Sequence, residues 1–147
     1  MKAKEYLRQV IILDTKINQR LQEADALYST ITGRALSYNR DKVQTSVSRL
    51  IEEKMDRYND LQREIDEMID ELILIKHQII NEIHSINAGG NTEVYMEILY
   101  EKYVDKKSLK QIAKEIGYDY KWLCKLHGRA LQCFQKQVLD NTNKHDL

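Results

Sequence analysis

The stretch Ser108–Leu131, SLKQIAKEIGYDYKWLCKLHGRAL, decides the fold that we expect for this chain. Ser108 is followed three residues later by Gln111, a capping box that satisfies free N–H groups in the first turn of a helix. Gly117 should end that helix, because glycine adopts the left-handed conformation of a helix C-terminus without a steric penalty. Asp119 then stands at the N-cap of a second helix. The stretch therefore predicts two short helices joined by a turn of about three residues.

Apolar residues recur at helical spacing in both segments, which gives each predicted helix one buried face. These residues are Leu109, Ile112, Ala113 and Ile116 in the first helix, and Leu123, Leu126, Ala130, Leu131 and Phe134 in the second. Two helices joined by so short a turn around a glycine cross steeply, as in a helix-turn-helix unit. In such a unit the start of the second helix enters the major groove of DNA.

The run Tyr95–Leu131 resembles region 4 of bacterial sigma factors, including the closing Arg129-Ala130-Leu131. The core pattern of helix-turn-helix proteins is matched at Ile112-Ala113, Ile116-Gly117, Leu123 and Leu126. The whole chain, in which a long helical part precedes this module, is similar to small phage-borne transcription regulators of Gram-positive hosts, the ArpU and RinA late-gene activators. That resemblance implies a role in activating late genes. The residues themselves do not distinguish activation from repression.

The composition favours helix throughout. The chain has 147 residues, no proline, one phenylalanine, nine tyrosines and 31% charged residues, so it has little material for a large globular core. It has no run of 18 or more apolar residues, and Lys2, Lys4, Glu5 and Arg8 break up its start. We expect a soluble protein of the bacterial host cytoplasm with no membrane partner.

Charge is distributed unevenly, although the formal net charge is zero. The segment Lys102–Lys136 holds nine Lys/Arg against three Asp/Glu, whereas Glu52–Glu71 holds three against nine. A basic module and an acidic helix are therefore joined in one chain, and the basic module is the one expected to meet nucleic acid.

Two long helices are predicted before the module. Met1–Thr32 should form the first, closed by Gly33, and about Arg49–Asn87 the second, with a connector over Ala35–Ser48. The first carries a seam in steps of three and four residues, at Leu7, Val10, Leu13, Ile17, Leu21, Ala24, Tyr28 and Ile31. The second helix is too long for the first to cover its whole apolar stripe. That stripe is broadest at Ile73, Ile75, Ile79, Ile80 and Ile83. We therefore expect an antiparallel hairpin that packs against a second copy, most simply as a dimer.

The flexible run Asn87–Asn91 marks the expected domain boundary. The predicted organisation is a helical hairpin for oligomerisation over 1–88, a DNA-binding helix-turn-helix module over 92–138, and a polar, frayed tail over 139–147. Within the module a supporting helix should follow, capped by Thr92 or Asn91. The predicted fold class is therefore all-α, with a long N-terminal hairpin or coiled coil followed by a sigma-region-4-like module.

Residues for contact with double-stranded DNA are expected on the basic module. Tyr120, Lys121 and Lys125 are candidates for base edges or flanking phosphates, and Trp122 could enter the core or stack on the sugar-phosphate backbone. The full candidate set is Lys106, Lys107, Lys110, Tyr120, Lys121, Trp122, Lys125 and Arg129. Lys114 and Lys136 would add to charge neutralisation. His127 lies beside this surface and could contact a phosphate.

Catalysis finds little support in the sequence, and we expect neither an enzyme nor a cofactor. His77, His84, His127 and His145 show no metal-ligand spacing with one another or with the cysteines, so no metal site is expected. Cys124 and Cys133 would be about 13 Å apart on one helix, too far for a disulfide.

Two other functions remain open from the sequence. A small terminase subunit of the DNA-packaging machinery also combines a helix-turn-helix with long oligomerising helices, although there the DNA-binding part usually comes first. An adaptor that contacts RNA polymerase or another protein through the sigma-like module would need no DNA. RNA polymerase is also a candidate partner for the regulator itself.

Overall fold

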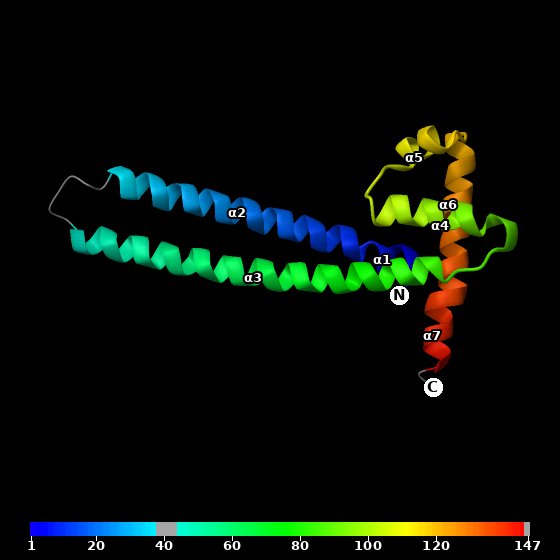
Figure 1. Ribbon diagram of the computed structural model, residues 1–147, viewed down its shortest axis with the longest axis horizontal. Coiled ribbons are helices and arrows are strands. Elements are labelled where there is room, and N and C mark those ends of the chain that lie inside the picture. Colours follow the sequence, from blue (N-terminus) through cyan, green and yellow to red (C-terminus); the bar gives the residue numbers. More distant parts are fainter. Residues whose placement is uncertain (38–43, 146–147) are drawn as a thin grey trace. The chain divides into compact units, whose positions relative to one another are not determined.

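A computed structural model describes residues 1–37 and 44–145, and every regular element in these ranges is helical (Figure 1). The predicted all-α class is confirmed for these residues. The elements in chain order are α1 (Ala3–Leu7), α2 (Gln9–Ser37), α3 (Gln44–His84), η1 (Gly89–Asn91), α4 (Thr92–Tyr103), α5 (Leu109–Ile116), α6 (Tyr120–Phe134), η2 (Gln135–Leu139) and α7 (Asp140–His145). The chain forms two compact units: a hairpin unit, Leu13–Leu72, and a head unit, Met1–Ile12 together with Ile73–Leu147.

In the hairpin unit, α2 and α3 run antiparallel, side by side (Figure 1). Ala24 of α2 packs with Leu61 and Ile65 of α3 in a small buried cluster. Three half-buried side chains border this cluster, namely Leu27, Tyr58 and Ile69. The small alanine opposite two branched side chains lets the two helices approach closely. The predicted antiparallel hairpin is thus present between α2 and α3.

Burial along α2 follows one half of the predicted seam. Val10, Ile17, Ala24 and Ile31 are buried and stand seven residues apart, so they share one face of the helix. The alternate seam residues Leu21 and Tyr28 are exposed, as is Met55 on α3. One stripe of the seam is therefore covered within the chain, and the other contacts solvent.

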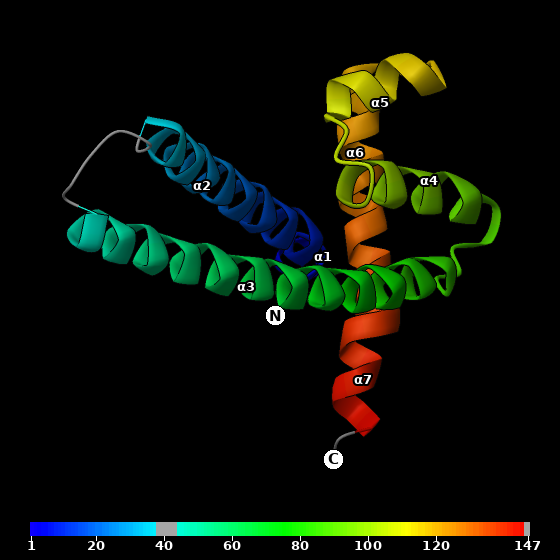
Figure 2. The same ribbon diagram turned by 60° about the vertical axis from the view of Figure 1, so that its left-hand side comes forward.

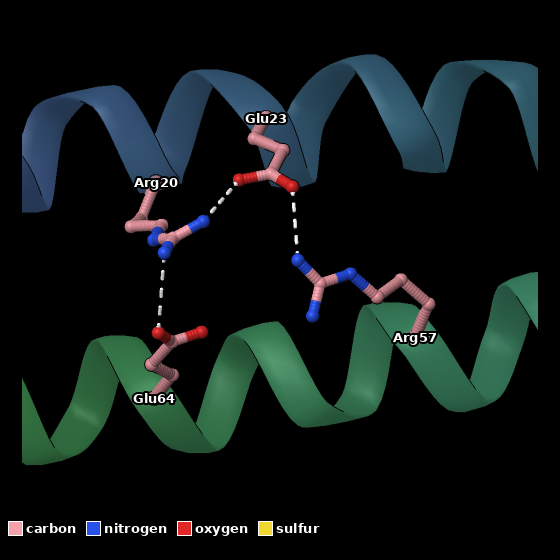
Figure 3. Close-up of polar contacts among 4 residues, drawn as sticks. All are labelled: Arg20, Glu23, Arg57 and Glu64. Atoms are coloured by element: carbon pink, nitrogen blue, oxygen red, sulfur yellow. Dashed lines mark hydrogen bonds and ion pairs between the residues drawn. The ribbon is translucent and has the colours of Figure 1, made fainter.

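Exposed ion pairs join the two helices of the hairpin unit (Figure 3). Arg20 on α2 contacts Glu23 at 2.8 Å and Glu64 on α3 at 3.4 Å, while Arg57 on α3 contacts Glu23 at 3.1 Å. The hydrogen bond from Arg20 lowers the pKa of the Glu23 carboxyl. Exposed pairs of this kind contribute little to stability because solvent screens them, so packing of the apolar cluster accounts for more of it.

At the connector both long helices extend beyond their predicted ends, whereas α3 stops at His84, before the predicted Asn87, and the predicted first helix is divided into α1 and α2. Gly33 was expected to close the first helix, yet α2 continues through it to Ser37, and α3 begins at Gln44 instead of Arg49. A single glycine costs a helix about 1 kcal/mol, and without a proline nearby the helix-forming residues after Gly33 continue it. The predicted connector Ala35–Ser48 is therefore helical at both flanks, and its central part, residues 38–43, lies outside the described residues.

In the head unit, α4 and α5 pack against α6, and α1 packs against α6 as well (Figure 2). The rings of Tyr6 on α1 and Phe134 on α6 lie 6.0 Å apart, and the Tyr6 hydroxyl donates to Glu82 of α3 at 2.7 Å. The largest fully buried side chains of the unit come from six helices: Leu7, Val10, Ile79, Ile83, Ile98, Leu99, Tyr103, Ile112, Leu123 and Phe134. The predicted boundary at Asn87–Asn91 is a loop and a short η1 turn inside this unit.

Two glutamines of η2, one turn of π-helix, hold other parts of the head unit. Gln135 Oε1 accepts from the Ala3 N–H at 2.6 Å. Gln137 accepts from the Asn87 N–H at 2.7 Å and donates to the Asn87 carbonyl at 2.6 Å. The chain start and the loop before α4 are thus fixed to the end of α6. The tail predicted to be frayed is helical up to His145, and residues 146–147 lie outside the described part.

None of the helices within residues 1–37 and 44–145 combines the length and the apolar character that a membrane span requires.

Candidate nucleic-acid interface

The turn between α5 and α6 is built by the residues that the sequence singled out. Ser108 accepts a hydrogen bond from the Gln111 N–H at 3.2 Å, so it caps α5 as predicted. The Gln111 side chain donates to Glu115 at 3.3 Å, and so this side chain is used within the helix instead of completing the box. Asp119 occupies the predicted N-cap of α6 in an extended conformation, but its side chain makes no capping hydrogen bond.

Gly117 ends α5 in the left-handed conformation, with φ 86° and ψ 24°. Its N–H donates to the Ala113 carbonyl at 2.9 Å, and the Tyr118 N–H donates to the same oxygen at 2.9 Å. These bonds satisfy a carbonyl at the end of α5 and redirect the chain into α6. The predicted role of this glycine is confirmed.

A pair of glycine substitutions should separate backbone strain from packing. A Cβ atom at Gly117 or at Gly128, inside α6, would meet no atom within 4 Å. Gly117→Ala should lower the free energy of unfolding by about 1 to 2 kcal/mol, because alanine is strained at positive φ. Gly128→Ala should raise it by up to about 1 kcal/mol, since alanine favours a helix interior. Urea unfolding of both variants measures the two effects, and shifts of the same sign would contradict this reading of the turn.

The apolar faces predicted for α5 and α6 are the buried ones. Ile112 and Ala113 of α5 are buried, as are Leu123, Leu126, Ala130 and Phe134 of α6. Leu109, Ile116 and Leu131 are half-buried. The opposite face of α6 is consequently free to carry polar and charged residues.

Five of the predicted contact residues are exposed along α6: Tyr120, Lys121, Trp122, Lys125 and Arg129. The exposed fractions of Tyr120 and Trp122 are 44% and 42%, so neither ring enters the core. Lys121 and Lys125 have no ion pair among the described residues. A hydrogen bond with the Cys124 thiol raises the pKa of the Tyr120 phenol, which therefore keeps its proton at neutral pH. We call this set the α6 outer face.

Cations lie against both aromatic rings of the α6 outer face. The Lys110 Nζ of α5 is 6.0 Å from the centre of the Tyr120 ring, and the Arg129 guanidinium is 5.3 Å from the centre of the Trp122 ring. The negative face of an aromatic ring attracts a cation, so these contacts favour the observed position of each ring. Tyr118 in the turn is a third exposed aromatic residue. The sequence prediction did not include it, although its place between the two helices was a usable signal.

Lys107 differs from the other candidate lysines because two carboxylates surround it. Its ammonium lies 2.8 Å from Glu115 and 3.5 Å from Glu101. The hydrogen bond with Glu115 raises the pKa of Lys107 and lowers that of Glu115. Lys107 therefore connects the loop to α4 and α5, and its charge is already balanced. Lys106 next to it is exposed, with a positive φ of 60°.

His127 belongs to the interior side of α6. Its Nε2 lies 2.8 Å from the Tyr103 hydroxyl of α4, and the two rings are stacked at 5.7 Å. Burial, with Lys102 and Lys4 nearby, lowers the pKa of His127 to about 4, and burial raises that of Tyr103 to about 12. Both groups are therefore uncharged at neutral pH.

No group of three or more His, Cys, Asp or Glu side chains in the described ranges could hold a metal ion, and both cysteines are free thiols. Comparisons with protein-family models, with curated proteins and with solved structures found no match to this chain. Function is therefore inferred from the surfaces described above.

Proposed function

We propose that this chain is a sequence-specific, DNA-binding transcription regulator of phage or prophage type, with a sigma-region-4-like helix-turn-helix over α5 and α6. In this proposal α6 is the recognition helix, α5 crosses the DNA backbone and α4 supports both. Activation of late genes is the role that the family resemblance implies.

The single observation that carries the proposal is the α6 outer face. A helix whose other side is buried against α4 and α5 presents a row of lysine and arginine side chains, with exposed aromatic rings beside it, beginning at its first turn. Lysine and arginine neutralise phosphates, and the same side chains with tyrosine can reach base edges. A solvated helix face alone does not require exposed tryptophan and tyrosine rings held by cations.

The dimensions of α6 fit a duplex. Lys121 and Arg129 are eight residues apart, which corresponds to about 12 Å of helix at 1.5 Å per residue. The major groove of B-DNA is about 12 Å wide and admits one α-helix. Lys121 and Lys125 are one turn apart on the same side. The row could therefore follow the groove without rearrangement of the backbone.

Footprinting and gel-shift measurements with fragments from around the gene test this proposal. A protected site and a retarded complex, both weakened by salt, are expected. If no DNA fragment is retarded at low salt, the proposal is contradicted. If the protein in the same preparation still co-purifies with RNA polymerase, the adaptor function is favoured instead. A ring of many subunits by sedimentation would favour the small terminase instead.

The regulator is proposed to act as a dimer through its long helices. Ile73 and Leu74 of α3 are 60% and 72% exposed, in the region where the apolar stripe was predicted to be widest. Leu21 and Tyr28 leave a second apolar stripe open on α2. Exposed large apolar side chains of this number on a monomer favour a protein partner. A second copy is the simplest one, since two-fold pairing would place two recognition helices on one duplex.

Replacing both Ile73 and Leu74 with glutamate should weaken self-association. Placing two carboxylates in an apolar interface costs several kcal/mol, so the dimer dissociation constant should rise at least about 100-fold. Sedimentation equilibrium over a range of concentrations measures it. Lys76→Glu, which introduces the same group at an exposed site on α3, is the control and should leave the association nearly unchanged. Equal dimer dissociation constants for the double variant and Lys76→Glu would exclude this interface, as would a parent protein that is monomeric.

A further inference from the structure

A pocket with an entirely positive charge lies in the head unit. Its volume is about 450 Å³. The lining residues come from α1, α2, α4, the loop after α4, α5 and α6: Lys4, Arg8, Ile11, Lys102, Tyr103, Lys106, Leu109 and His127. Every lining side chain that carries a charge at neutral pH is a lysine or an arginine. The pocket is separate from the α6 outer face, because it contains none of that face's residues.

Packing of α1 in the head unit creates this charge cluster. Lys4 and Arg8 stand four residues apart at the start of the chain, so they share one side of a helical turn. Lys102 belongs to α4, almost a hundred residues later. Neither Lys4, Arg8 nor Lys102 forms an ion pair with a described carboxylate. Like charges held together repel, and a bound anion is the direct way to balance them.

The wall formed by Tyr103 and His127 supplies a hydrogen-bond donor without adding charge. The two side chains share one hydrogen bond of 2.8 Å between Oη and Nε2. If the phenol donates, the neutral imidazole carries its proton on Nδ1; if Nε2–H donates, the phenol keeps its own hydrogen. In both tautomers one N–H or O–H remains for a further acceptor. Burial lowers the pKa of His127 most, and the charges of Lys102 and Lys4 lower it further, as expected for a wall beside these cations.

We propose that this pocket binds a phosphate group. A phosphate dianion has several acceptor oxygens and enough charge to balance two cations, whereas a carboxylate balances one. Arginine matches phosphate geometry with two parallel hydrogen bonds, and lysine contributes a point charge. The volume lies within the range of small-molecule sites, so the pocket can hold a compound larger than phosphate itself.

The phosphate could belong to a free phosphorylated compound or to the backbone of bound DNA. Both sources present the same chemistry to Lys4, Arg8 and Lys102. The inference does not rest on the proposed function, because the pocket exists in the head unit whether or not α6 reads DNA.

Titration calorimetry of the full chain with inorganic pyrophosphate at low ionic strength tests the site. We expect saturable binding, weakened about tenfold or more by Arg8→Gln or by Lys102→Gln, since each removes a charge-assisted hydrogen bond. Lys76→Gln, an equal charge change on exposed α3, should leave the affinity within about twofold. Absence of binding to the parent protein, or an equal loss with Lys76→Gln, would overturn the proposal.

A second measurement needs no variant. Pyrophosphate beside His127 should offset the neighbouring cations, so the imidazole pKa, followed by NMR in the parent protein, should rise by at least about one pH unit on saturation. An unchanged pKa at saturation would place the bound anion elsewhere and refute the pocket.

Adding a short DNA duplex to the pyrophosphate complex distinguishes the sources. Displacement of pyrophosphate would support a backbone phosphate as the ligand, and simultaneous binding would support a free phosphorylated compound. Failure of the duplex to bind, with pyrophosphate still bound, would contradict the proposed DNA-binding function while supporting the pocket.

Discussion

The double variant Lys121→Ala/Lys125→Ala is expected to bind duplex DNA at least about 30-fold more weakly than the parent chain. Each lysine is exposed on α6, without a carboxylate partner in the described part, so each can give its full charge to DNA. A contact of this kind contributes about 1 to 3 kcal/mol, and 1.4 kcal/mol is a factor of ten in affinity. Fluorescence anisotropy with a labelled operator fragment measures the loss.

The dependence of binding on salt tells what each lysine contacts. If Lys121 or Lys125 neutralises a phosphate, the slope of log affinity against log salt should fall by about 1 for each lysine removed. If either reads a base edge, the slope should change little and the preference among sequences should broaden at one position. Both results agree with α6 as the recognition helix.

Lys107→Ala is the matched control inside the same module. It removes the same charge, but from an ammonium that Glu115 and Glu101 already balance. Its effect on DNA affinity should therefore be smaller than that of either α6 lysine alone. Losses of equal size at Lys107, Lys121 and Lys125 would mean that only total charge matters and that α6 does not enter the groove.

The contrast between Lys107 and Lys121 also shows how far the sequence could predict the site. The position of α6, its buried face and the exposure of Lys121 follow from Ser108, Gly117 and the apolar spacing, all of which are local signals. The pairing of Lys107 depends on Glu101, six residues before it, across the end of α4. No local spacing rule predicts this contact, because the loop conformation between them decides it.

Trp122 illustrates the same limit on a smaller scale. Its position left two orientations open, toward the core or toward solvent, because it stands directly before the buried Leu123. The structure turns the ring outward, against Arg129. Composition and periodicity are enough to predict the helical fold class. They are not enough to predict where the long helices end. Gly117 ends α5, but Gly33 does not end α2. No turn residues follow Gly33, and α2 continues through it to Ser37.

The first residues of the chain belong to the head unit and not to the hairpin for which their periodicity was predicted. Periodicity predicts which face of a helix is buried, but it does not identify the helix that covers that face. The spacing predicts Leu7 as the first residue of a seam that another helix covers. In the structure α1 packs against α6, and Gln135 holds the chain start. A fragment that begins after residue 88 would thus lack part of the head unit's core.

Leu7→Ala is accordingly expected to destabilise a module that lies a hundred residues away in the sequence. Leu7 is fully buried beside Ala3 and Val10, which are buried as well. Truncation of a buried leucine to alanine costs about 2 to 5 kcal/mol, from lost transfer free energy and the cavity left behind. Because α1 contacts α6, this loss should be felt by the head unit as a whole.

Amide hydrogen exchange locates the effect. Protection of the Leu123 and Leu126 amides in α6 should fall by roughly 30-fold or more, if they exchange through opening of the head unit. Amides around Ala24 and Leu61 in the hairpin unit should change much less, since that unit has its own apolar cluster.

Ile12→Ala supplies the comparison. Ile12 is 46% exposed and lies five residues after Leu7, so its truncation should change the free energy of unfolding by less than about 1 kcal/mol. If exchange in α6 were unaffected by Leu7→Ala, or affected equally by Ile12→Ala, α1 would not be part of the core that supports the proposed recognition helix. The present packing instead makes the first turn of the chain a structural support for α6, and loss of DNA binding in Leu7→Ala should follow the loss of α6 protection.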